Sequence, residues 1–207
     1  MEGLRERKKR ETRETIARTA MDLFGARGYD AVTVADVARA ADVSEKTVFN
    51  YFPAKEDLVF NEGQARREAL IDAIRARPAG ESLVEPFRRQ TEELIDRLGA
   101  GPDESFVAIP RLVGESSVLR ERLFLGWERE AAVLTPVIAE ETGAGPDDLV
   151  PGVVARSLAW TNRLVFRAAF NRLIAGEDPR ALAADLREQA NRAYDQLEGG
   201  LRDYGVR

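Results

Sequence analysis

Apolar residues recur every three to four positions along most of the chain, the spacing of one face of an α-helix. Near the N-terminus, Ile16, Ala20, Leu23 and Phe24 follow this spacing and predict a first helix that ends at Gly28. No run of β-branched residues alternates convincingly with polar ones, so we expect an all-α fold with about nine helices. After two short helices that begin at Thr33 and Ser44, the expected helices are residues 55–77, 82–98, 103–113, 116–142, 148–175 and 178–201.

The stretch "TVADVARAADVSEKTVFNYF" contains two helix starts within twenty residues. Thr33 with Asp36 three residues later forms a capping box, and Ser44 begins the next helix. Each start is flanked by two valines at the positions of a hydrophobic staple. Pro53 disfavours helical geometry at the residue before it, so the second helix should end near Tyr51. The pattern predicts two short helices joined by a tight turn.

The second of these short helices has two different faces. Val48 and Phe52 are four residues apart and should face inward, whereas Glu45, Lys46 and Phe49 share an outer face. A two-turn helix is marginally stable alone, so the helix before it must support it through packing. Such a helix fits the major groove of B-DNA, where a helix-turn-helix places the N-terminal residues of its second helix near base edges.

The composition excludes several classes of chemistry. The chain has 207 residues with no Cys and no His, which removes disulfides, Cys/His zinc sites and nucleophiles activated by histidine. No metal-ligand spacing and no glycine-rich phosphate loop is present, so we expect no catalytic residue, no metal and no cofactor. The alternative is an enzyme whose helical domain uses carboxylates such as Glu92, Glu93, Glu140 and Glu141, although adjacent acidic residues on helices are normally solvated.

The net charge of −5 argues against a nucleic-acid binder until its distribution is considered. Up to Phe60 eleven Lys and Arg residues balance eleven Asp and Glu residues, which leaves 20 against 25 in the remainder. A basic cluster precedes the expected first helix and is either a solvated lead-in or an arm that follows the DNA backbone. Its members are Arg5, Arg7, Lys8, Lys9, Arg10 and Arg13. Neither a signal peptide nor an apolar run long enough for a membrane span is present, so we expect a cytoplasmic protein without a membrane partner.

The residues from Thr15 to Leu58 resemble the DNA-binding domain of the TetR family of bacterial repressors. The motifs "A-x-x-L-F-x-x-x-G-Y", "T-V-x-D-V-A-x-x-A" and "V-S-x-x-T-V-F-x-Y-F-x-x-K-E-x-L" occur in order and at the spacing of that family. Two positions differ from the pattern of that family. Asp42 replaces the usual turn glycine and would have to adopt a left-handed conformation, and Phe49 replaces the usual tyrosine of the recognition helix.

The resemblance implies which residues contact a double-stranded DNA operator. Glu45, Lys46 and Phe49 are the candidates for base edges, because Lys46 can donate to guanine and Glu45 can accept from cytosine. Helix starts attract anions, which adds Thr33 and Ser44 as candidates for phosphate contact, although capping alone also explains both residues. The phosphate candidates are Thr33, Ser44, Thr47, Asn50, Tyr51 and Lys55, of which Tyr51 is alternatively part of the core.

The resemblance further implies a head at residues 1–57, with its motif at 33–52, and an effector-binding and dimerisation domain at 58–207. Aromatic residues of the second domain either form an ordinary core or line an apolar pocket for a small-molecule effector of unknown identity. The candidates for the pocket are Phe106, Trp127, Trp160 and Phe166. Arg163 and Arg167 either bind an anionic effector or lie in solvent or in ion pairs.

A homodimer through the last two helices would place two recognition helices on a palindromic operator. The sequence therefore predicts a DNA-binding transcriptional regulator that is not an enzyme, a repressor that an effector releases from its operator. Two alternatives remain at this point. The protein is a TetR-like activator, or it is an architectural DNA-binding protein without an effector.

Overall fold

The computed structural model describes residues 3–61, 63–101 and 104–201, except for the side chains of residues 4 and 104–106. In this part of the chain every regular element is helical, which confirms the all-α prediction. The helices are α1 (Leu4–Arg27), α2 (Val34–Ala40), α3 (Glu45–Tyr51), the 3₁₀ turn η1 (Lys55–Leu58), α4 (Gly63–Arg75), α5 (Val84–Gly99), α6 (Glu104–Glu115), α7 (Ser117–Thr142), α8 (Val150–Ile174) and α9 (Pro179–Leu201). None of the helices described is long and apolar enough to cross a membrane.

Two compact units make up the chain. Unit 1 contains the residues up to Gly63 together with Glu104–Arg122, and unit 2 contains the rest. Residues 104–122 thus group with the N-terminal residues, and α7 contributes residues to both units. The domain boundary that the sequence places between residues 57 and 58 stays a prediction.

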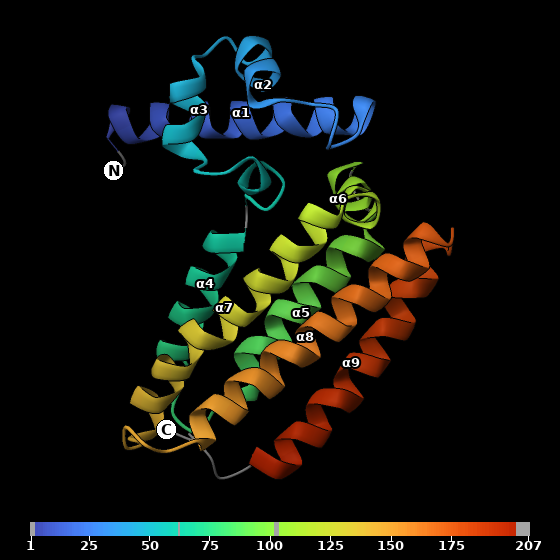
Figure 1. The fold of residues 1–207 in the computed structure, drawn as a ribbon. Coiled ribbons are helices and arrows are strands. Elements are labelled where there is room, and N and C mark those ends of the chain that lie inside the picture. The colour runs from blue at the N-terminus through green and yellow to red at the C-terminus, as the bar shows by residue number, and fades with distance from the viewer. Residues whose placement is uncertain (1–2, 62, 102–103, 202–207) are drawn as a thin grey trace. The chain divides into compact units, whose positions relative to one another are not determined.

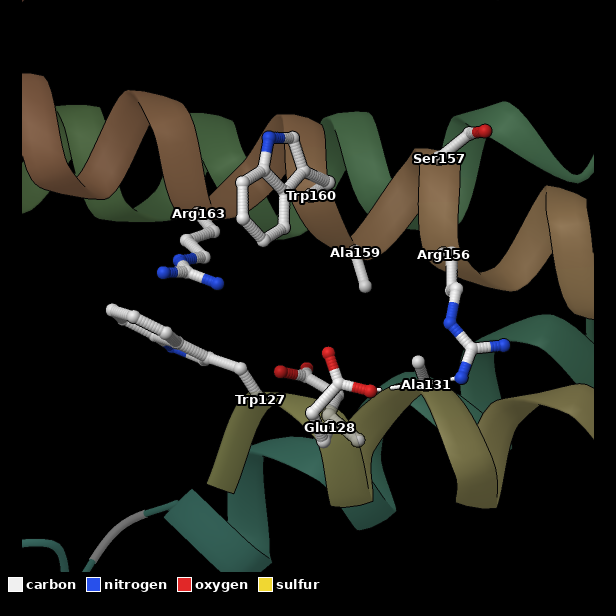
Figure 2. Close-up of a pocket in the computed structure, with 9 residues that line it drawn as sticks. Trp127, Glu128, Ala131, Arg156, Ser157, Ala159, Trp160 and Arg163 are labelled. Carbon is white, nitrogen blue, oxygen red and sulfur yellow. Dashed lines mark ion pairs between the residues drawn. The ribbon is translucent and has the colours of Figure 1, made fainter. Parts of the chain in front are cut away.

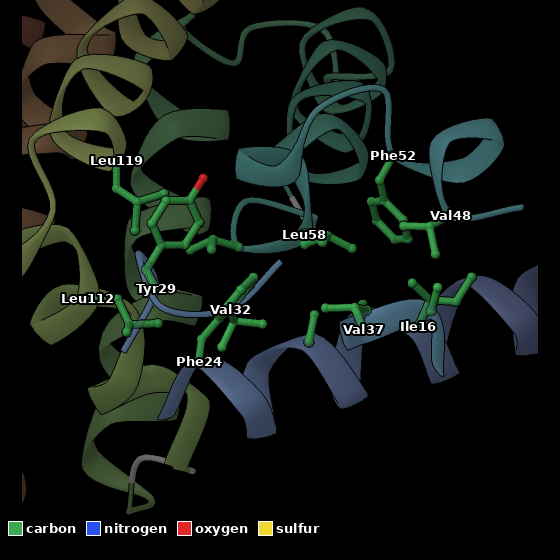
Figure 3. Packing of buried hydrophobic residues seen from close by; sticks show 14 residues of the cluster. Ile16, Phe24, Tyr29, Val32, Val37, Val48, Phe52, Leu58, Leu112 and Leu119 are labelled. Atoms are coloured by element: carbon green, nitrogen blue, oxygen red, sulfur yellow. The ribbon is translucent and has the colours of Figure 1, made fainter. Parts of the chain in front are cut away.

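The core of unit 1 is built on the apolar face of α1 (Figure 3). Ile16 and Phe24 are fully buried there, and the short helices α2 and α3 each add a buried valine, Val37 and Val48. The chain leaves α1 at Gly28, which has a φ of 79° that favours glycine. This core supports two helices of seven residues each, which are too short to be stable alone.

The first helix is longer than its apolar pattern indicates. It begins at Leu4, so the basic cluster belongs to α1 and does not precede it. Arg, Lys and Glu have high helix propensities, and two pairs four residues apart stabilise this part further. Arg7 lies 3.6 Å from Glu11, and Arg10 lies 3.6 Å from Glu14. Charged pairs, which an apolar pattern does not reveal, therefore help to extend α1 toward Leu4.

The helix expected at residues 55–77 is wrong in its first part. The chain forms the short turn η1 there and begins α4 only at Gly63. The Asp57 carboxylate accepts a hydrogen bond from the Ala54 N–H at 3.0 Å and closes this turn. Leu58 and Val59 are both buried in the core of unit 1, which holds the chain in this turn.

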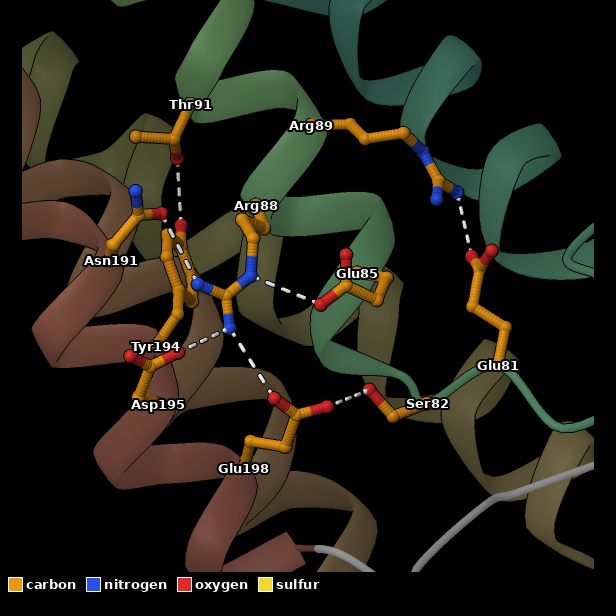
Figure 4. A network of polar contacts seen from close by, with 10 residues as sticks. All are labelled: Glu81, Ser82, Glu85, Arg88, Arg89, Thr91, Asn191, Tyr194, Asp195 and Glu198. Atoms are coloured by element: carbon orange, nitrogen blue, oxygen red, sulfur yellow. Dashed lines mark hydrogen bonds and ion pairs between the residues drawn. The ribbon is translucent and has the colours of Figure 1, made fainter. Parts of the chain in front are cut away.

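Unit 2 is a bundle in which α5 packs against α8 and α9 (Figure 1). Its core includes the fully buried Phe87 and Tyr194, and the hydroxyl groups of Thr91 and Tyr194 lie 2.7 Å apart. Figure 4 shows Arg88 of α5 beside α9, where it donates to Asp195 at 2.9 Å. A buried hydroxyl pair and a more exposed ion pair thus join α5 to α9 in addition to the apolar contacts.

Candidate nucleic-acid interface and ligand groove

The start of α2 is fixed by the predicted capping box. The Thr33 hydroxyl accepts from the Asp36 N–H at 3.1 Å, and the Asp36 carboxylate accepts from the Thr33 N–H at 3.0 Å. The same carboxylate accepts from the Thr33 hydroxyl at 2.7 Å. The hydrogen bond from the Thr33 backbone, followed by that from its hydroxyl, lowers the pKa of Asp36 to about 2. Thr33 is exposed at this helix start and its hydroxyl serves the cap, so its contact with phosphate stays a prediction.

The turn into α3 uses the residue that replaces the usual glycine. Asp42 has a φ of 54°, the left-handed conformation that the sequence required of it. Ser44 then caps α3, because its hydroxyl accepts from the Thr47 N–H at 3.0 Å. α3 ends at Tyr51, as predicted from Pro53.

The two faces of α3 separate as the sequence predicted. Val48 and Phe52 are each 1% exposed, while Phe49 is 46% exposed. Glu45, Lys46 and Asn50 are exposed, and Thr47 and Tyr51 are half-buried. We call the side chains of Glu45, Lys46, Phe49 and Asn50 the outer face of α3. A polar and aromatic surface therefore stands on a fully buried support.

The ammonium group of Lys55, a candidate for phosphate contact, is held in place by contacts within unit 1. Its ammonium group donates to the Tyr29 carbonyl at 2.7 Å and lies 3.9 Å from the centre of the Tyr29 ring. Burial lowers the pKa of Lys55, against the opposing effect of Asp30 and Glu56. Lys55 thus holds η1 against the end of α1.

Arg13 has a structural role that the sequence analysis missed by placing it in the basic cluster. Its guanidinium donates to the Tyr51 carbonyl at 2.8 Å and lies 4.4 Å from the centre of the Phe52 ring. It therefore anchors the C-terminal end of α3 to α1. Its position three residues before the buried Ile16 was the available signal, because that spacing puts both on one face.

A groove of about 390 Å³ lies between α7 and α8 in unit 2 (Figure 2). We call it the α7–α8 groove. It brings together Trp127 and Trp160, two of the four aromatic residues expected at a pocket. Phe166 does not line it and packs at right angles against Phe170, with 4.0 Å between the ring centres. The fourth candidate, Phe106, has a side chain outside the described residues.

Arg163 is the main charged group of this groove. It is 9% exposed, and its guanidinium carbon lies 3.3 Å from the centre of the Trp127 ring and 4.0 Å from that of Trp160. Of the alternatives that the sequence left open for Arg163, a solvated or ion-paired side chain is wrong, because the guanidinium is buried beside aromatic rings. The contact between Arg163 and Trp127 could not be predicted from the sequence, since Trp127 is 36 residues away on another helix.

Three further charged residues line the α7–α8 groove. Arg156 and Glu128 form an exposed ion pair of 3.6 Å. Burial raises the pKa of Glu130, against the opposing effect of Arg67 and Arg66. Among the described residues, no group of three or more acidic side chains is placed to hold a metal ion.

The helix-turn-helix and its exposed outer face define the class of protein as a DNA-binding regulator. The family model described as "Bacterial regulatory proteins, tetR family" matches residues 16–61. The chain is 32% identical over 187 residues to the HTH-type transcriptional regulator TcmR of Streptomyces glaucescens, a match that covers 87% of this chain and 82% of the relative. The chain therefore belongs to the TetR family and is a DNA-binding transcriptional regulator.

Two solved structures have a similar fold. SmeT in its complex with triclosan matches with a TM-score of 0.59 and 18% identity, over 92% of this chain and 91% of that chain. NalD, the secondary repressor of the MexAB-OprM multidrug efflux pump in Pseudomonas aeruginosa, matches with a TM-score of 0.57 and 20% identity, over 89% of this chain and 97% of that chain. At these identities the likeness concerns the fold alone.

Proposed function

We propose that this protein is a sequence-specific repressor whose α3 enters the major groove of an operator and which a small-molecule effector releases. The observation that carries the proposal is the outer face of α3, held outward while Val48 and Phe52 are buried beneath it. An α-helix fits the width of the major groove of B-DNA. In a helix-turn-helix the residues near the start of the second helix lie nearest to the bases.

Three residues of the outer face have the chemistry for base edges. Lys46 can donate to O6 or N7 of guanine, and Glu45 can accept from N4 of cytosine. Phe49 lacks a hydroxyl but presents an apolar edge that suits a thymine methyl group. All three side chains are exposed, so reading bases requires no rearrangement of the core.

Six residues are proposed to contact phosphates and fix the register on the duplex. Thr33 and Ser44 lie at helix starts, where backbone N–H groups and the helix dipole favour anions. Lys55 contributes its charge from a fixed position, because its ammonium group stays bound to the Tyr29 carbonyl. The other three are Thr47, Asn50 and Tyr51.

A homodimer through α8 and α9 would give the operator its symmetry. Val153 and Leu164 of α8 are exposed large apolar side chains eleven residues apart, a spacing that puts them on one side of the helix. Such a stripe is a candidate for burial against a second copy. A two-fold axis then predicts a palindromic operator with half-sites roughly 34 to 36 Å apart.

The α7–α8 groove is the proposed effector site. Its volume of about 390 Å³ lies within the range of small-molecule sites, and aromatic residues line it. The solved complex of SmeT with triclosan shows a protein of similar fold together with a small molecule, which supports the same role here. An effector that prefers the form unable to bind DNA would shift the population toward that form.

The experiment is selection of duplexes from a random pool, followed by anisotropy titrations of the selected duplex over a range of salt concentrations. We expect a palindromic sequence, an affinity that falls steeply with salt, and a large loss of affinity when one half-site is scrambled. Enrichment of no sequence, with equal affinity for all duplexes, would instead indicate an architectural DNA-binding protein. A reporter gene whose expression rises with the protein would indicate an activator.

A further inference from the structure

Arg163 stands out among the buried charges of the molecule because its partners are aromatic rings. Two indole rings flank its guanidinium, and the Phe124 ring centre lies 4.9 Å from it. In the part of the chain that the structure describes, no carboxylate or carbonyl accepts a hydrogen bond from it. A guanidinium carries five N–H donors, and neighbouring aromatic rings leave those donors without a carboxylate or carbonyl acceptor. The donors of Arg163 are therefore available at the edge of the groove that it lines.

The other charged residues of the groove leave Arg163 as its dominant charge. Arg156 and Glu128 offset each other in their ion pair. Burial raises the pKa of Glu130, but the positive charges of Arg67 and Arg66 oppose this rise and offset the charge of the carboxylate. Burial, followed by the positive charge of Arg167 four residues away, lowers the pKa of Arg163, and Glu128 opposes this effect. An arginine nevertheless keeps its charge at neutral pH, because its ordinary pKa lies far above 7.

The shape of the lining selects a flat partner. Trp127 from α7 and Trp160 from α8 face Arg163 from two helices (Figure 2). The two indole rings extend beyond the guanidinium carbon that they flank, so an aromatic ring held at the guanidinium edge would meet their apolar surfaces. A carboxylate matches the fork of an arginine with two parallel hydrogen bonds. Charge and shape thus specify the same kind of molecule.

We propose that the α7–α8 groove binds a planar aromatic anion, an aryl carboxylate or a molecule that contains one, and that Arg163 determines this specificity. The inference rests on the proposed function, because it takes the groove as the effector site. It goes further by assigning the charge and shape of the ligand. A neutral or cationic aromatic molecule of the same size should bind more weakly, since the guanidinium would lose solvent without gaining an acceptor.

The test uses three naphthalene probes of nearly equal size: 2-naphthoate, 2-naphthalenemethanol and 2-naphthylmethylammonium. Calorimetric titration of the full chain at pH 7 should give an affinity for naphthoate about tenfold or more above that for the alcohol. The ammonium probe should bind most weakly of the three. Equal affinities for naphthoate and the alcohol, a preference for the ammonium probe, or no binding of any probe would each overturn the proposal.

Arg163→Gln and Arg167→Gln form a matched pair, because both remove one positive charge from α8 and only Arg163 lines the groove. Arg163→Gln should make the affinities for naphthoate and the alcohol equal, while Arg167→Gln should change their ratio by less than about twofold. Arg163→Lys keeps the charge without the planar fork and should restore part of the preference. It also serves as the folded comparison if Arg163→Gln melts early. An equal loss of the preference in both glutamine variants would contradict a specific role for Arg163.

The same preparations separate this inference from the proposed function. Wild-type protein that binds its selected duplex but shows no preference for naphthoate would remove the inference and leave the repressor proposal in place. Protein that prefers naphthoate but enriches no duplex would do the reverse. When both hold, naphthoate should lower duplex affinity, and the duplex should lower naphthoate affinity by the same factor.

Discussion

The outer face of α3 and the α7–α8 groove both combine aromatic and charged side chains. The two sites differ in whether the charged side chain is exposed or buried. On α3 the charged residues Glu45 and Lys46 are exposed, and the side chains that fix them lie beneath in the core. In the groove Arg163 is itself buried, between Trp127 and Trp160. The first surface can meet a large partner such as a duplex, whereas the second can only enclose a small one.

This difference has an energetic consequence. An exposed charge contributes little to the stability of the fold, so it is mainly available for binding a partner. A buried charge has lost water and interacts strongly with whatever replaces it. Substitutions on α3 should therefore change recognition with little change in stability, whereas substitutions of buried groups should change stability directly.

The sharpest test of this contrast uses two phenylalanines of the same segment. Phe52→Ala removes a side chain that is 1% exposed and should destabilise unit 1 by about 3 to 5 kcal/mol. Phe49→Ala removes one that is 46% exposed and should change the free energy of unfolding by less than about 0.5 kcal/mol while weakening DNA binding. Thermal unfolding followed by circular dichroism measures the first, and duplex anisotropy the second. Equal destabilisation by both variants would show that Phe49 belongs to the core.

A smaller loss is expected inside unit 2. Tyr194→Phe leaves the buried Thr91 hydroxyl without its 2.7 Å partner and should cost about 1 to 3 kcal/mol. Urea unfolding of this variant, of Thr91→Val and of the double variant measures the coupling between the two groups. The double variant should lose less than the sum of the single losses. Strict additivity would mean that the two hydroxyls do not stabilise each other.

Lys46 and Lys55 differ in their surroundings and should differ in their effects on DNA binding. Lys46→Gln should relax the preference at one base pair by about 1 to 3 kcal/mol, because the exposed ammonium is free to meet a base edge. Lys55→Gln should weaken binding to all sequences alike and reduce the salt slope by about one. It should also destabilise unit 1, since it loses the contact with the Tyr29 carbonyl. Competition titrations with single-base variants of the operator distinguish the two patterns, and identical patterns would contradict the division of roles.

The N-terminal cap of α3 should contribute less to the free energy of unfolding than the groups above. Ser44→Ala removes the acceptor for the Thr47 N–H and should cost about 1 kcal/mol of stability, whereas Ser44→Asn keeps a capping side chain and should cost much less. Denaturant unfolding gives the stabilities, and duplex titrations show whether phosphate contact is lost as well. A loss of DNA affinity in both variants at unchanged stability would assign Ser44 mainly to the phosphate.

The smallest effect concerns pH. The pKa of Asp36 is about 2 in the folded protein and near 3.9 in an unfolded chain, so the stabilising effect of its carboxylate is complete above pH 5. That effect is lost as the pH falls through about 4 toward 2. A carboxyl titration by NMR should give the low value, and Thr33→Val should raise it because the hydroxyl donor is removed. A pKa near 4 in the wild-type protein would show that the capping box does not form.

Local patterns predicted most of this fold, and contacts between distant residues explain what they missed. The capping box at Thr33, the turn at Asp42 and the end of α3 at Tyr51 all depend on neighbours within a few positions. The break between η1 and α4 was missed because Lys55 is bound to the Tyr29 carbonyl and Leu58 packs into the core of unit 1, contacts that apolar spacing does not reveal.

The two sites follow the same rule. The outer face of α3 was predictable because helical spacing assigns its faces, with Val48 and Phe52 inward and Phe49 outward. In the groove, Trp127 and Trp160 were chosen as aromatic residues without any sign that they meet. The stacking of Arg163 between them joins two helices and has no local signature. Residue type alone suggested solvent for this arginine, and only the packing of α7 against α8 determines its surroundings.

The central claim is that the outer face of α3 reads DNA, and duplex selection with two proteins tests it most directly. Wild-type protein and the double variant Lys46→Gln with Phe49→Ala are carried through the same random pool, after melting curves confirm that both are folded. We predict a palindromic consensus for the wild type, and loss of the preferred bases at the positions that α3 meets for the variant. An identical consensus from both proteins, or none from the wild type, would contradict the account.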